Sequence, residues 1–412
     1  MRVSHYNTFA EGGSAVLMLR LHQALRKMGC DSRVRYRKGH LNIPGSQRVE
    51  YADQWQDIQL EHILRRADSL ILKPGAPSYY GRLKYHKATP LIGEDEDADI
   101  IHLHWVNQWL DLPSFLAKIP KHIPLVWTIH DMSALAGGCF TDFGCDQFSG
   151  GCHRCPLLKA PFDRILPRKE YLRRRKALEG RRLYAVGNSH FTTGLIQKSP
   201  LFESAKITTI HPALNVDNYV PHDRTEARRL LGIPPDRFVL GFGAVSLTDE
   251  NKGFFRFLQV AEMVADRMGA LDVLVFGDGV PLFKSTKVTV HGLGRLSSPN
   301  IQSLAYSAMD VFLVTSRMET FGQVATEAQA CGTPVWAFDV GGLSDAIQDG
   351  VTGRLIPFSD TEKMAESICS AFDEGSLLRM GNHGAEWVRK NFCVEYMAER
   401  YIDLFRKALD SE

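Results

Sequence analysis

The chain has 412 residues, of which 44% are hydrophobic and 23% charged, so length and composition indicate a globular protein of two or three domains. The net charge of +2 gives no general reason to expect nucleic acid as a partner. No apolar run reaches the roughly 18 residues of a membrane-spanning helix, and the N-terminal residues lack the apolar stretch of a signal peptide. We expect a cytoplasmic protein, with peripheral contact to the inner face of a membrane left open.

Strands and helices alternate along the first half of the chain. Residues 2–7 are typical of a strand, Gly12-Gly13-Ser14 follows, and an amphipathic helix is expected over about 15–28. The further predicted strands lie within residues 34–36, 98–105, 123–131 and 181–190. This alternation predicts a parallel sheet with helices on both faces.

The pattern pauses at "IHPALNVDNYVPHD", residues 210–223, and this segment is typical of a connection between domains. Alternation then resumes. The second set of predicted strands lies within residues 236–245, 271–279, 287–294, 310–316, 333–342 and 352–357. We therefore predict an α/β protein with two Rossmann-like doubly wound domains and a cleft between them. The expected domains are 1–212 and 213–392, with a C-terminal helix over 393–412 that packs back on the first domain.

Unusual polar and glycine residues follow the predicted strands. They are Gly12-Gly13, His130-Asp131, Lys252, Gly277-Asp278-Gly279 and Glu319. Ligands of doubly wound sheets bind beyond the carboxyl ends of the strands, so this edge is the expected binding site. Each motif taken alone also has a structural explanation: a turn for the glycines, a hydrogen-bonded histidine at a strand end, and a solvated lysine.

The segment "SRMETFGQVATEAQACGTPV", residues 316–335, holds two carboxylates, Glu319 and Glu327, separated by seven residues. A helix that opens at Thr320-Phe321-Gly322 would offer free backbone N–H groups and a positive dipole end to a phosphate. Carboxylates before and within that helix would accept hydrogen bonds from hydroxyls. The pattern therefore favours a ligand with hydroxyls at both ends and phosphate between them, such as a nucleotide-sugar. The alternative is a helix-start anion and a solvated helix residue.

The stretch "ETFGQVATEAQACGTPV", with the later "GG" and "DGVTGRLIP", resembles the donor-site segment of the family 4 glycosyltransferases, retaining enzymes of the GT-B fold. Weaker similarity covers the Gly-Gly loop, His130-Asp131, the connection near residue 210 and Lys252-Gly253. The resemblance implies transfer of a sugar from a nucleoside-diphosphate-sugar to a hydroxyl of a saccharide or lipid-linked saccharide, in surface polysaccharide or glycolipid assembly. The resemblance also implies that catalysis uses no metal ion and no carboxylate nucleophile of the enzyme.

The resemblance also implies roles for the donor side. Glu327 would hold the nucleotide ribose, and Glu319 would contact hydroxyls of the transferred sugar. Lys252 would neutralise the leaving diphosphate, on which charge builds as the glycosidic bond breaks. The expected donor contacts are completed by Thr320, Phe321 and Gly322.

On the other side of the reaction, the resemblance places Gly12-Gly13-Ser14 against donor phosphate and acceptor, and His130 close to the reacting carbon. Asp131 would orient His130. His102 and His104 share one strand face, where they either line the acceptor side or have a structural role. The expected catalytic residues are His130, Lys252 and Glu319.

The sequence departs from the family pattern at one point. The family carries an arginine several residues before the lysine, but this chain reads Val245-Ser246-Leu247 there. Either Ser246 takes a reduced role or another base, such as Arg295, substitutes. The rival functions are a sugar-nucleotide epimerase or phosphorylase of the same fold, and a nucleotide-sugar-binding protein without catalysis.

Four cysteines are clustered: Cys139, Cys145, Cys152 and Cys155. This spacing suits a tetrahedral structural zinc, with His153 as a spare ligand. A cytoplasmic location argues against disulfides, while an iron–sulfur cluster and free or redox-active thiols stay open. We expect this insertion to shape the acceptor site.

The stretch "RKEYLRRRKALEGRR", residues 168–182, is strongly basic. It is either a solvated helix face or a docking surface for anionic lipid or a lipid diphosphate acceptor. Nucleic acid is not expected, because no recognised binding motif accompanies the charge.

Overall fold

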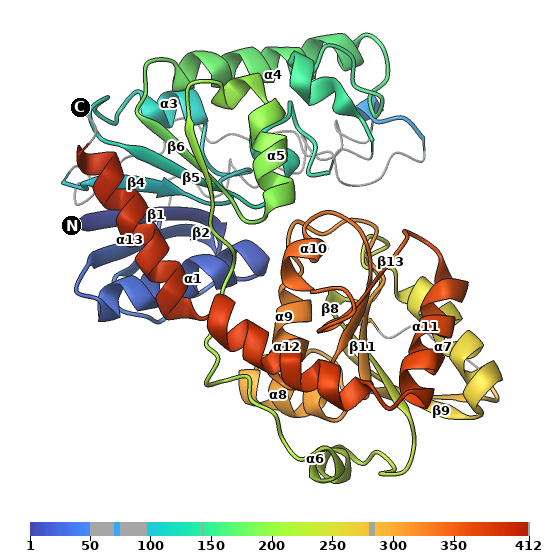
Figure 1. Cartoon of the computed structure of the whole chain (residues 1–412). Coiled ribbons are helices and arrows are strands. Elements are labelled where there is room, and N and C mark those ends of the chain that lie inside the picture. Colours follow the sequence, from blue (N-terminus) through green and yellow to red (C-terminus); the bar gives the residue numbers. More distant parts are fainter. Residues whose placement is uncertain (50–69, 75–96, 142–143, 280–284, 411–412) are drawn as a thin grey trace. The chain divides into compact units, whose positions relative to one another are not determined.

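The structure is a computed structural model that describes residues 1–49, 70–74, 97–141, 144–279 and 285–410. The chain folds as two compact units (Figure 1). Unit 1 comprises Met1–Ile210 and Ala398–Glu412, and unit 2 comprises His211–Met397. In the described part of the chain, no helix combines the length and the apolar character that a membrane span requires.

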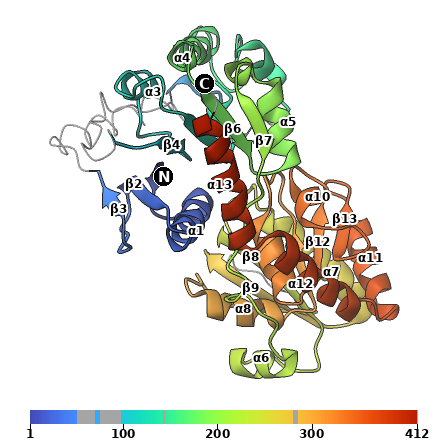
Figure 2. The same ribbon diagram turned by 60° about the vertical axis from the view of Figure 1, so that its left-hand side comes forward.

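The sheet of unit 1 has the strand order β3-β2-β1-β4-β5-β6-β7, and its described strand pairs are all parallel (Figures 1 and 2). The strands form where the sequence predicts buried runs. Their bounds are β1 Arg2–Phe9, β2 Asp31–Lys38, β3 Ser46–Arg48, β4 Ile100–Leu103, β5 Leu125–Ile129, β6 Leu183–Gly187 and β7 Lys206–Thr209.

Side chains alternate between the two faces of this sheet, as the pleat requires. One face is apolar and forms a core with α3 and α4, through residues such as Leu103, Trp127 and Tyr171. The opposite face carries a polar layer that includes His102 and Thr128, and Tyr401 of the last helix donates to or accepts from Thr128 (Oη···Oγ1 2.8 Å). The helices are α1 Gly13–Lys27, α3 Leu112–Leu116, α4 Phe162–Leu178, α5 His190–Lys198 and α13 Val394–Asp410, whose residues from 398 on belong to unit 1.

The sheet of unit 2 has the order β10-β9-β8-β11-β12-β13, again with parallel pairs throughout its described strands. Helices α7 and α11 build the core on one face, while α8, α9 and α12 build it on the other. The strands are β8 Val239–Ser246, β9 Leu271–Asp278, β10 Val288–Gly292, β11 Val311–Val314, β12 Val335–Phe338 and β13 Gly353–Ile356. The helices are α6 Arg224–Leu231, α7 Phe254–Met268, α8 Pro299–Ser307, α9 Gln323–Ala330, α10 Leu343–Ala346, α11 Thr361–Asp373 and α12 Leu377–Asn391.

The predicted α/β class with two doubly wound domains is confirmed. In each sheet the strand order reverses direction at one place, between β1 and β4 in unit 1 and between β8 and β11 in unit 2. At such a switch point, the connections that follow the two neighbouring strands cross to opposite faces of the sheet. The loops after these strands therefore diverge and leave the carboxyl edge of the sheet accessible. The candidate residues therefore have to be sought after β1, β4, β8 and β11.

Candidate functional site

Lys252 and Glu319 meet at the switch point of unit 2. Lys252 lies in the loop after β8, and Glu319 lies in the loop after β11. The Lys252 Nζ is 2.7 Å from Glu319 Oε1, and Ser316 Oγ donates to the same oxygen at 2.7 Å. The Lys252 side chain is 33% exposed and that of Glu319 11%, so this ion pair remains accessible to a ligand on the lysine side.

Hydrogen bonds to backbone carbonyl groups hold these two loops together. Asn251 Nδ2 donates to the carbonyl of Met318 at 2.9 Å, and the Arg317 N–H donates to the carbonyl of Asn251 at 2.7 Å. Gly253 has φ +72°, and a Cβ there would lie 2.1 Å from the Thr315 carbonyl oxygen. A glycine is needed at this position both for the left-handed conformation and for the close approach.

The charge on Lys252 is secured by its partner. Burial alone would lower the pKa of the Lys252 ammonium, but the Glu319 carboxylate raises it through its charge and its hydrogen bond, and the net effect is a raised pKa. The side chain therefore stays protonated throughout the physiological pH range. A fixed positive charge at a sheet edge is the feature that a departing phosphate requires.

Helix α9 begins three residues later than the sequence predicts. Thr320 and Phe321 precede it, and its N-cap is Gly322 with φ +89°, so the helix starts at Gln323. The Phe321 side chain is 2% exposed and packs against the rings of His211 and Phe392. The ring is therefore part of the core, and the expected backbone contact of Phe321 with a ligand stays a prediction.

Glu327 lies inside α9, one turn beyond its first residue, as predicted. Its Oε2 accepts a hydrogen bond of 3.2 Å from the hydroxyl of Tyr306, which is fully buried. Burial, and next the charge of Glu327, raise the pKa of the Tyr306 phenol well above 10, so the phenol remains a donor. Tyr306 thus fixes one carboxylate oxygen of a partly exposed glutamate.

Ser246 and Arg295 lie at the same edge of the sheet, Ser246 at the end of the switch-point strand β8 and Arg295 further away, after β10. Ser246 ends β8, and its hydroxyl is 2.9 Å from that of Thr248. Arg295 follows β10, and its Nη1 is 3.8 Å from Asp278 Oδ2, with both side chains about half exposed. The strand order puts β9 and β8 between β10 and β11, so Arg295 comes from the third strand away from that of Glu319. Its substitution for the missing arginine stays a prediction.

The switch point of unit 1 carries the glycine loop. Gly12 is the N-cap of α1 with φ +94°, and no side chain caps this helix start. Gly12 and Gly13 are exposed, Ser14 is half-buried, and a Cβ on Gly12 would meet no atom within 4 Å. The first turn holds no acidic residue. A helix start without an acidic residue in its first turn suits an anion.

His130 belongs to a row of buried imidazoles that we call the histidine row, made of His5, His104 and His130. His5 Nδ1 is 3.2 Å from His104 Nε2, and His104 Nδ1 is 3.2 Å from His130 Nε2. His104 is 2% exposed, so any influence it has on an acceptor passes through His130. His102 lies beside the row, with its ring centroid 4.2 Å from that of His104.

Burial lowers the pKa of His130 to about 3, and the pKa of His104 is also well below 6.5 because of burial and neighbouring histidines. Both rings are therefore neutral. The suggestion that Asp131 orients His130 is wrong. Asp131 accepts hydrogen bonds from Trp105 Nε1 at 2.7 Å and from the Ser133 N–H at 2.8 Å, while His104 is the residue bonded to His130.

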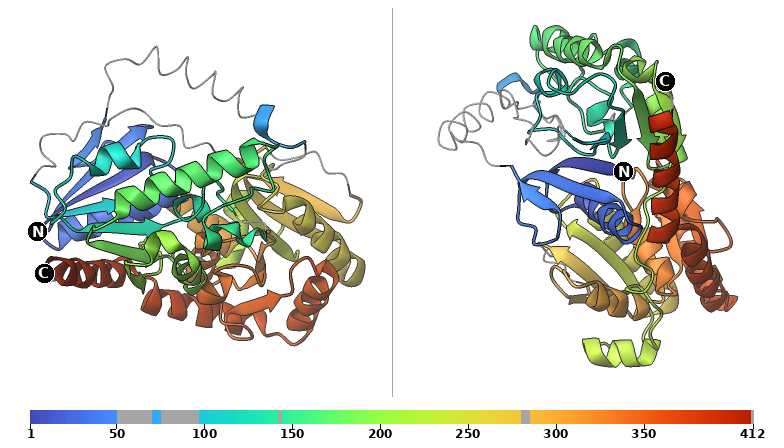
Figure 3. Two further views of the ribbon diagram at one scale, coloured as in Figure 1. Left: turned by 90° about the horizontal axis from the view of Figure 1, so that it is seen from above. Right: turned by 90° about the vertical axis from the view of Figure 1, so that its left-hand side faces the viewer.

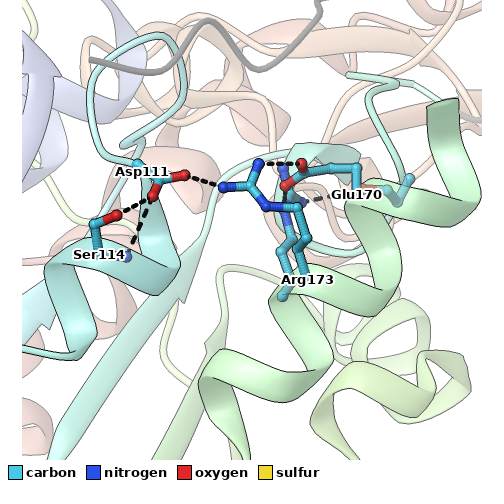
Figure 4. A network of polar contacts seen from close by, with 6 residues as sticks. Asp111, Ser114, Glu170 and Arg173 are labelled. Atoms are coloured by element: carbon cyan, nitrogen blue, oxygen red, sulfur yellow. Dashed lines mark hydrogen bonds and ion pairs between the residues drawn. The ribbon is translucent and has the colours of Figure 1, made fainter. Parts of the chain in front are cut away.

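The basic stretch is largely used within the fold (Figure 4). Arg173 bridges Asp111 at 2.5 Å and Glu170 at 3.5 Å, and Asp111 also accepts from the Ser114 N–H at 3.3 Å. Arg174 is buried and contacts Glu170 at 3.0 Å. These arginines link α4 to α3 and to the segment after β5. Part of the positive charge of the basic stretch is therefore used in contacts within the protein and not in binding a ligand.

Sequence reasoning missed several residues of the site. Ser316 and Asn251 adjoin predicted residues. Ser316 bonds Glu319, three residues further on, whereas Asn251 bonds Met318, 67 residues away, and residue type alone indicates neither contact. Tyr306 and His5 lie on apolar elements, where a buried tyrosine or histidine is normally a core residue. The four predicted cysteine ligands lie in unit 1, where they line a single cavity.

Comparison with known proteins agrees with this geometry. The model of "Glycosyltransferase Family 4" matches residues 11–218, and that of "Glycosyl transferases group 1" matches residues 237–374. The D-inositol 3-phosphate glycosyltransferase of Mycobacterium avium is 29% identical over 289 residues, covering 66% of this chain and 60% of that protein. The one from Kribbella flavida is 29% identical over 331 residues, covering 76% and 72%. The chain therefore matches about 60% of the length of its mycobacterial relatives.

Solved structures share the fold over nearly the whole chain. Sucrose-phosphate synthase from Thermosynechococcus elongatus has a TM-score of 0.66 at 18% identity and covers 99% of both chains. Anabaena HepE in complex with UDP-glucose has a TM-score of 0.66 at 16% identity and covers 99% of this chain and 100% of that one. The family match over half of the chain and the shared two-sheet fold lead to one conclusion: the chain belongs to glycosyltransferase family 4.

Proposed function

We propose that this protein transfers a sugar, with retention of anomeric configuration, from a nucleoside-diphosphate-sugar to an acceptor hydroxyl, in polysaccharide or glycolipid assembly. The observation that carries the proposal is the Lys252–Glu319 pair, 2.7 Å apart at the switch point of unit 2. The pair places a lasting positive charge beside a carboxylate, next to the start of α9. Family membership and the UDP-glucose complex of Anabaena HepE support the donor class.

In this proposal the two carboxylates bind opposite ends of the donor. Glu327, held by Tyr306, accepts hydrogen bonds from the ribose hydroxyls, and Glu319 accepts them from the sugar. The start of α9 lies between the two glutamates in sequence, where its N–H groups suit the diphosphate. Lys252 then exchanges part of its contact with Glu319 for the phosphate oxygens.

The chemical step breaks the bond between the anomeric carbon and the phosphate oxygen, and forms a bond to the acceptor oxygen on the same face. The acceptor proton passes to the departing phosphate. Lys252 stabilises the charge that develops on the leaving group, and this lowers the barrier because the interaction is strongest in the transition state. His130, a neutral ring held by His104, is the proposed contact to the sugar in unit 1.

The first experiment is a thermal-shift screen against a panel of nucleotide-sugars, which identifies the donor without knowledge of the acceptor. A ligand present at 100 times its Kd should stabilise the protein by about 2.7 kcal/mol. The selected donor is then incubated with acceptor extracts, and the anomeric configuration of the product is read by NMR. Product with inverted configuration, an epimerised donor, or binding without transfer to any extract would each contradict the proposal.

The protein is also proposed to contact an anionic lipid surface through the outer face of α4, the long green helix in Figure 3. Phe162, Ile165 and Leu172 are 39%, 53% and 44% exposed, and they recur at helical spacing with exposed Lys169 and Lys176. Apolar side chains beside lysines suit the boundary of an anionic membrane. Lys169, Leu172 and Lys176 belong to the basic stretch, and their side chains are exposed.

Vesicle sedimentation tests this contact. The protein should bind vesicles that contain phosphatidylserine and be released by salt, because lysines near an anionic surface contribute about 1 kcal/mol each. Leu172→Glu should weaken binding, whereas Leu230→Glu, on a leucine of α6 that is 56% exposed, should not. Equal binding to neutral vesicles, or no difference between the two variants, would exclude α4 as the contact.

A further inference from the structure

A small cavity in unit 1 brings the four clustered cysteines together. Its volume is about 20 Å³, room for roughly one water or one ion. The cysteines come from a segment of only 17 residues, yet all four line the same cavity, together with apolar side chains such as Met132 and Phe148. The lining cysteines are Cys139, Cys145, Cys152 and Cys155.

Two of the four sulfur atoms accept hydrogen bonds from backbone N–H groups, as metal-bound thiolates do. The Cys155 sulfur accepts hydrogen bonds from the backbone N–H groups of Leu157 and Leu158. The Cys152 sulfur accepts one of 3.2 Å from the Gly137 N–H. Cys139 hydrogen-bonds the Cys155 sulfur. Backbone N–H groups aimed at sulfur stabilise negative charge there, which buried neutral thiols do not need.

The frame around the cavity is fixed by α4. The Cys155 N–H donates to the Asp163 carbonyl at 2.9 Å, and Arg168 Nη1 donates to the Gly151 carbonyl at 3.2 Å. Buried Arg174 donates to the carbonyls of Ser133 and Ala136, at 3.0 Å for the latter. Its positive charge acts on Cys152 and would offset part of the charge of a thiolate cluster.

We propose that Cys139, Cys145, Cys152 and Cys155 bind one structural Zn²⁺. Four sulfur ligands around a small, apolar cavity suit a structural zinc site, and each thiol would release its proton on binding. Among the described residues, no three of these sulfur atoms lie within 4.8 Å of one another, so binding requires the sulfurs to move closer together. The site lies outside the donor residues and is independent of the proposed function.

The position of the cavity gives the ion a structural consequence. Met132 and Ala136 line it, and they lie in the segment that follows β5, shortly after His130 and Asp131. A bound ion would therefore brace this segment. Removal of the ion should loosen this segment and lower the thermal stability of unit 1, while the donor residues of unit 2 stay intact.

The experiment measures metal content and free thiols in the whole chain, purified without chelator. We expect about one zinc per chain by mass spectrometry of the digested protein, no stoichiometric iron, and loss of zinc in Cys139→Ser and Cys155→Ser. Cys369→Ser, a cysteine of α11 outside the cavity, is the control and should keep it. The wild-type protein provides a second measurement in case a variant fails to fold. A chelator added under denaturing conditions should raise the titratable thiols from four to all eight cysteines.

Each outcome decides the matter. Zinc that is lost from both cavity variants and retained by the control supports the site, as does protease sensitivity of residues 132–158 on chelation. Stoichiometric iron, or eight titratable thiols under denaturing conditions before any chelator is added, would overturn it. Four thiols that appear only after reduction would show disulfides instead.

Discussion

Replacing Lys252 by methionine tests the central contact of the proposed site. The change keeps the length and apolar stem of the side chain and removes the charge. Glu319 would keep one partner, the Ser316 hydroxyl at 2.7 Å. The ion pair is one-third exposed on the lysine side, so its loss should change stability by no more than about 1 kcal/mol. An effect on activity is therefore separable from unfolding.

The expected loss of turnover follows from the interaction of an ammonium with a leaving diphosphate. Two unit charges 4 Å apart attract by about 4 kcal/mol at the effective dielectric constant of a partly exposed site. Removing one preorganised electrostatic contact of a transition state costs about 2.7–4 kcal/mol, or roughly 10²–10³ in kcat. Because Lys252 is partly solvated, we expect the lower end, about a hundredfold fall in kcat.

The assay follows release of nucleoside diphosphate from the donor identified by thermal shift, with melting temperature measured alongside. Lys287→Met is the matched control, since Lys287 forms an exposed ion pair with Asp266 in the same unit. Glu319→Gln and the double variant complete a cycle that measures how far the two residues act together. If Lys252→Met retains kcat within about threefold and the control behaves alike, then the lysine does not stabilise the leaving group and the site is misplaced.

Three further predictions concern the surroundings of this pair. Glu327→Gln keeps the contact with Tyr306 but loses the charge, so calorimetry should show nucleoside diphosphate binding about 10- to 100-fold weaker with the fold intact; unchanged affinity would remove Glu327 from the ribose contact. Gly253→Ala would place a Cβ 2.1 Å from a carbonyl oxygen. It should lower the melting temperature more than Gly232→Ala, because Gly232 has the same left-handed conformation but a Cβ there would meet no atom within 4 Å. Equal losses of melting temperature would contradict the close approach at Gly253. Burial lowers the pKa of His102 to about 3, so below pH 6.5 the unfolded chain binds a proton at this residue that the folded protein does not. His102 alone should therefore lower the free energy of unfolding by about 1.4 kcal/mol per pH unit from pH 6 towards 3, in addition to the contributions of His5, His104 and His130. His102→Phe should reduce the slope of stability against pH by about that amount, and an unchanged slope in acid denaturation would exclude a contribution from His102.

The apolar strands and their alternation with helices were predictable because both depend on local sequence. A buried parallel strand requires a short apolar run, and the chain supplies one at each predicted position. The segment around Glu319 and Glu327 was likewise predictable, because its residues are close in sequence and Glu327 had to lie within the following helix. The start of that helix was placed too early, since the positive φ of Gly322 is not evident from residue type alone.

Pairing of distant residues was decided only by the tertiary structure. Lys252 and Glu319 are separated by two strands of the chain, β9 and β10, yet they meet because the sheet places β11 directly beside β8. The histidine row has the same origin, since pairing of β1 with β4 brings His5 and His104 together, and this row holds His130 where Asp131 was expected to act. Local sequence thus determined which chemical groups lie at the strand ends, whereas the order of the strands in the sheet determined which of these groups are in contact. Local sequence cannot determine that order, because it depends on how whole helices and strands pack together.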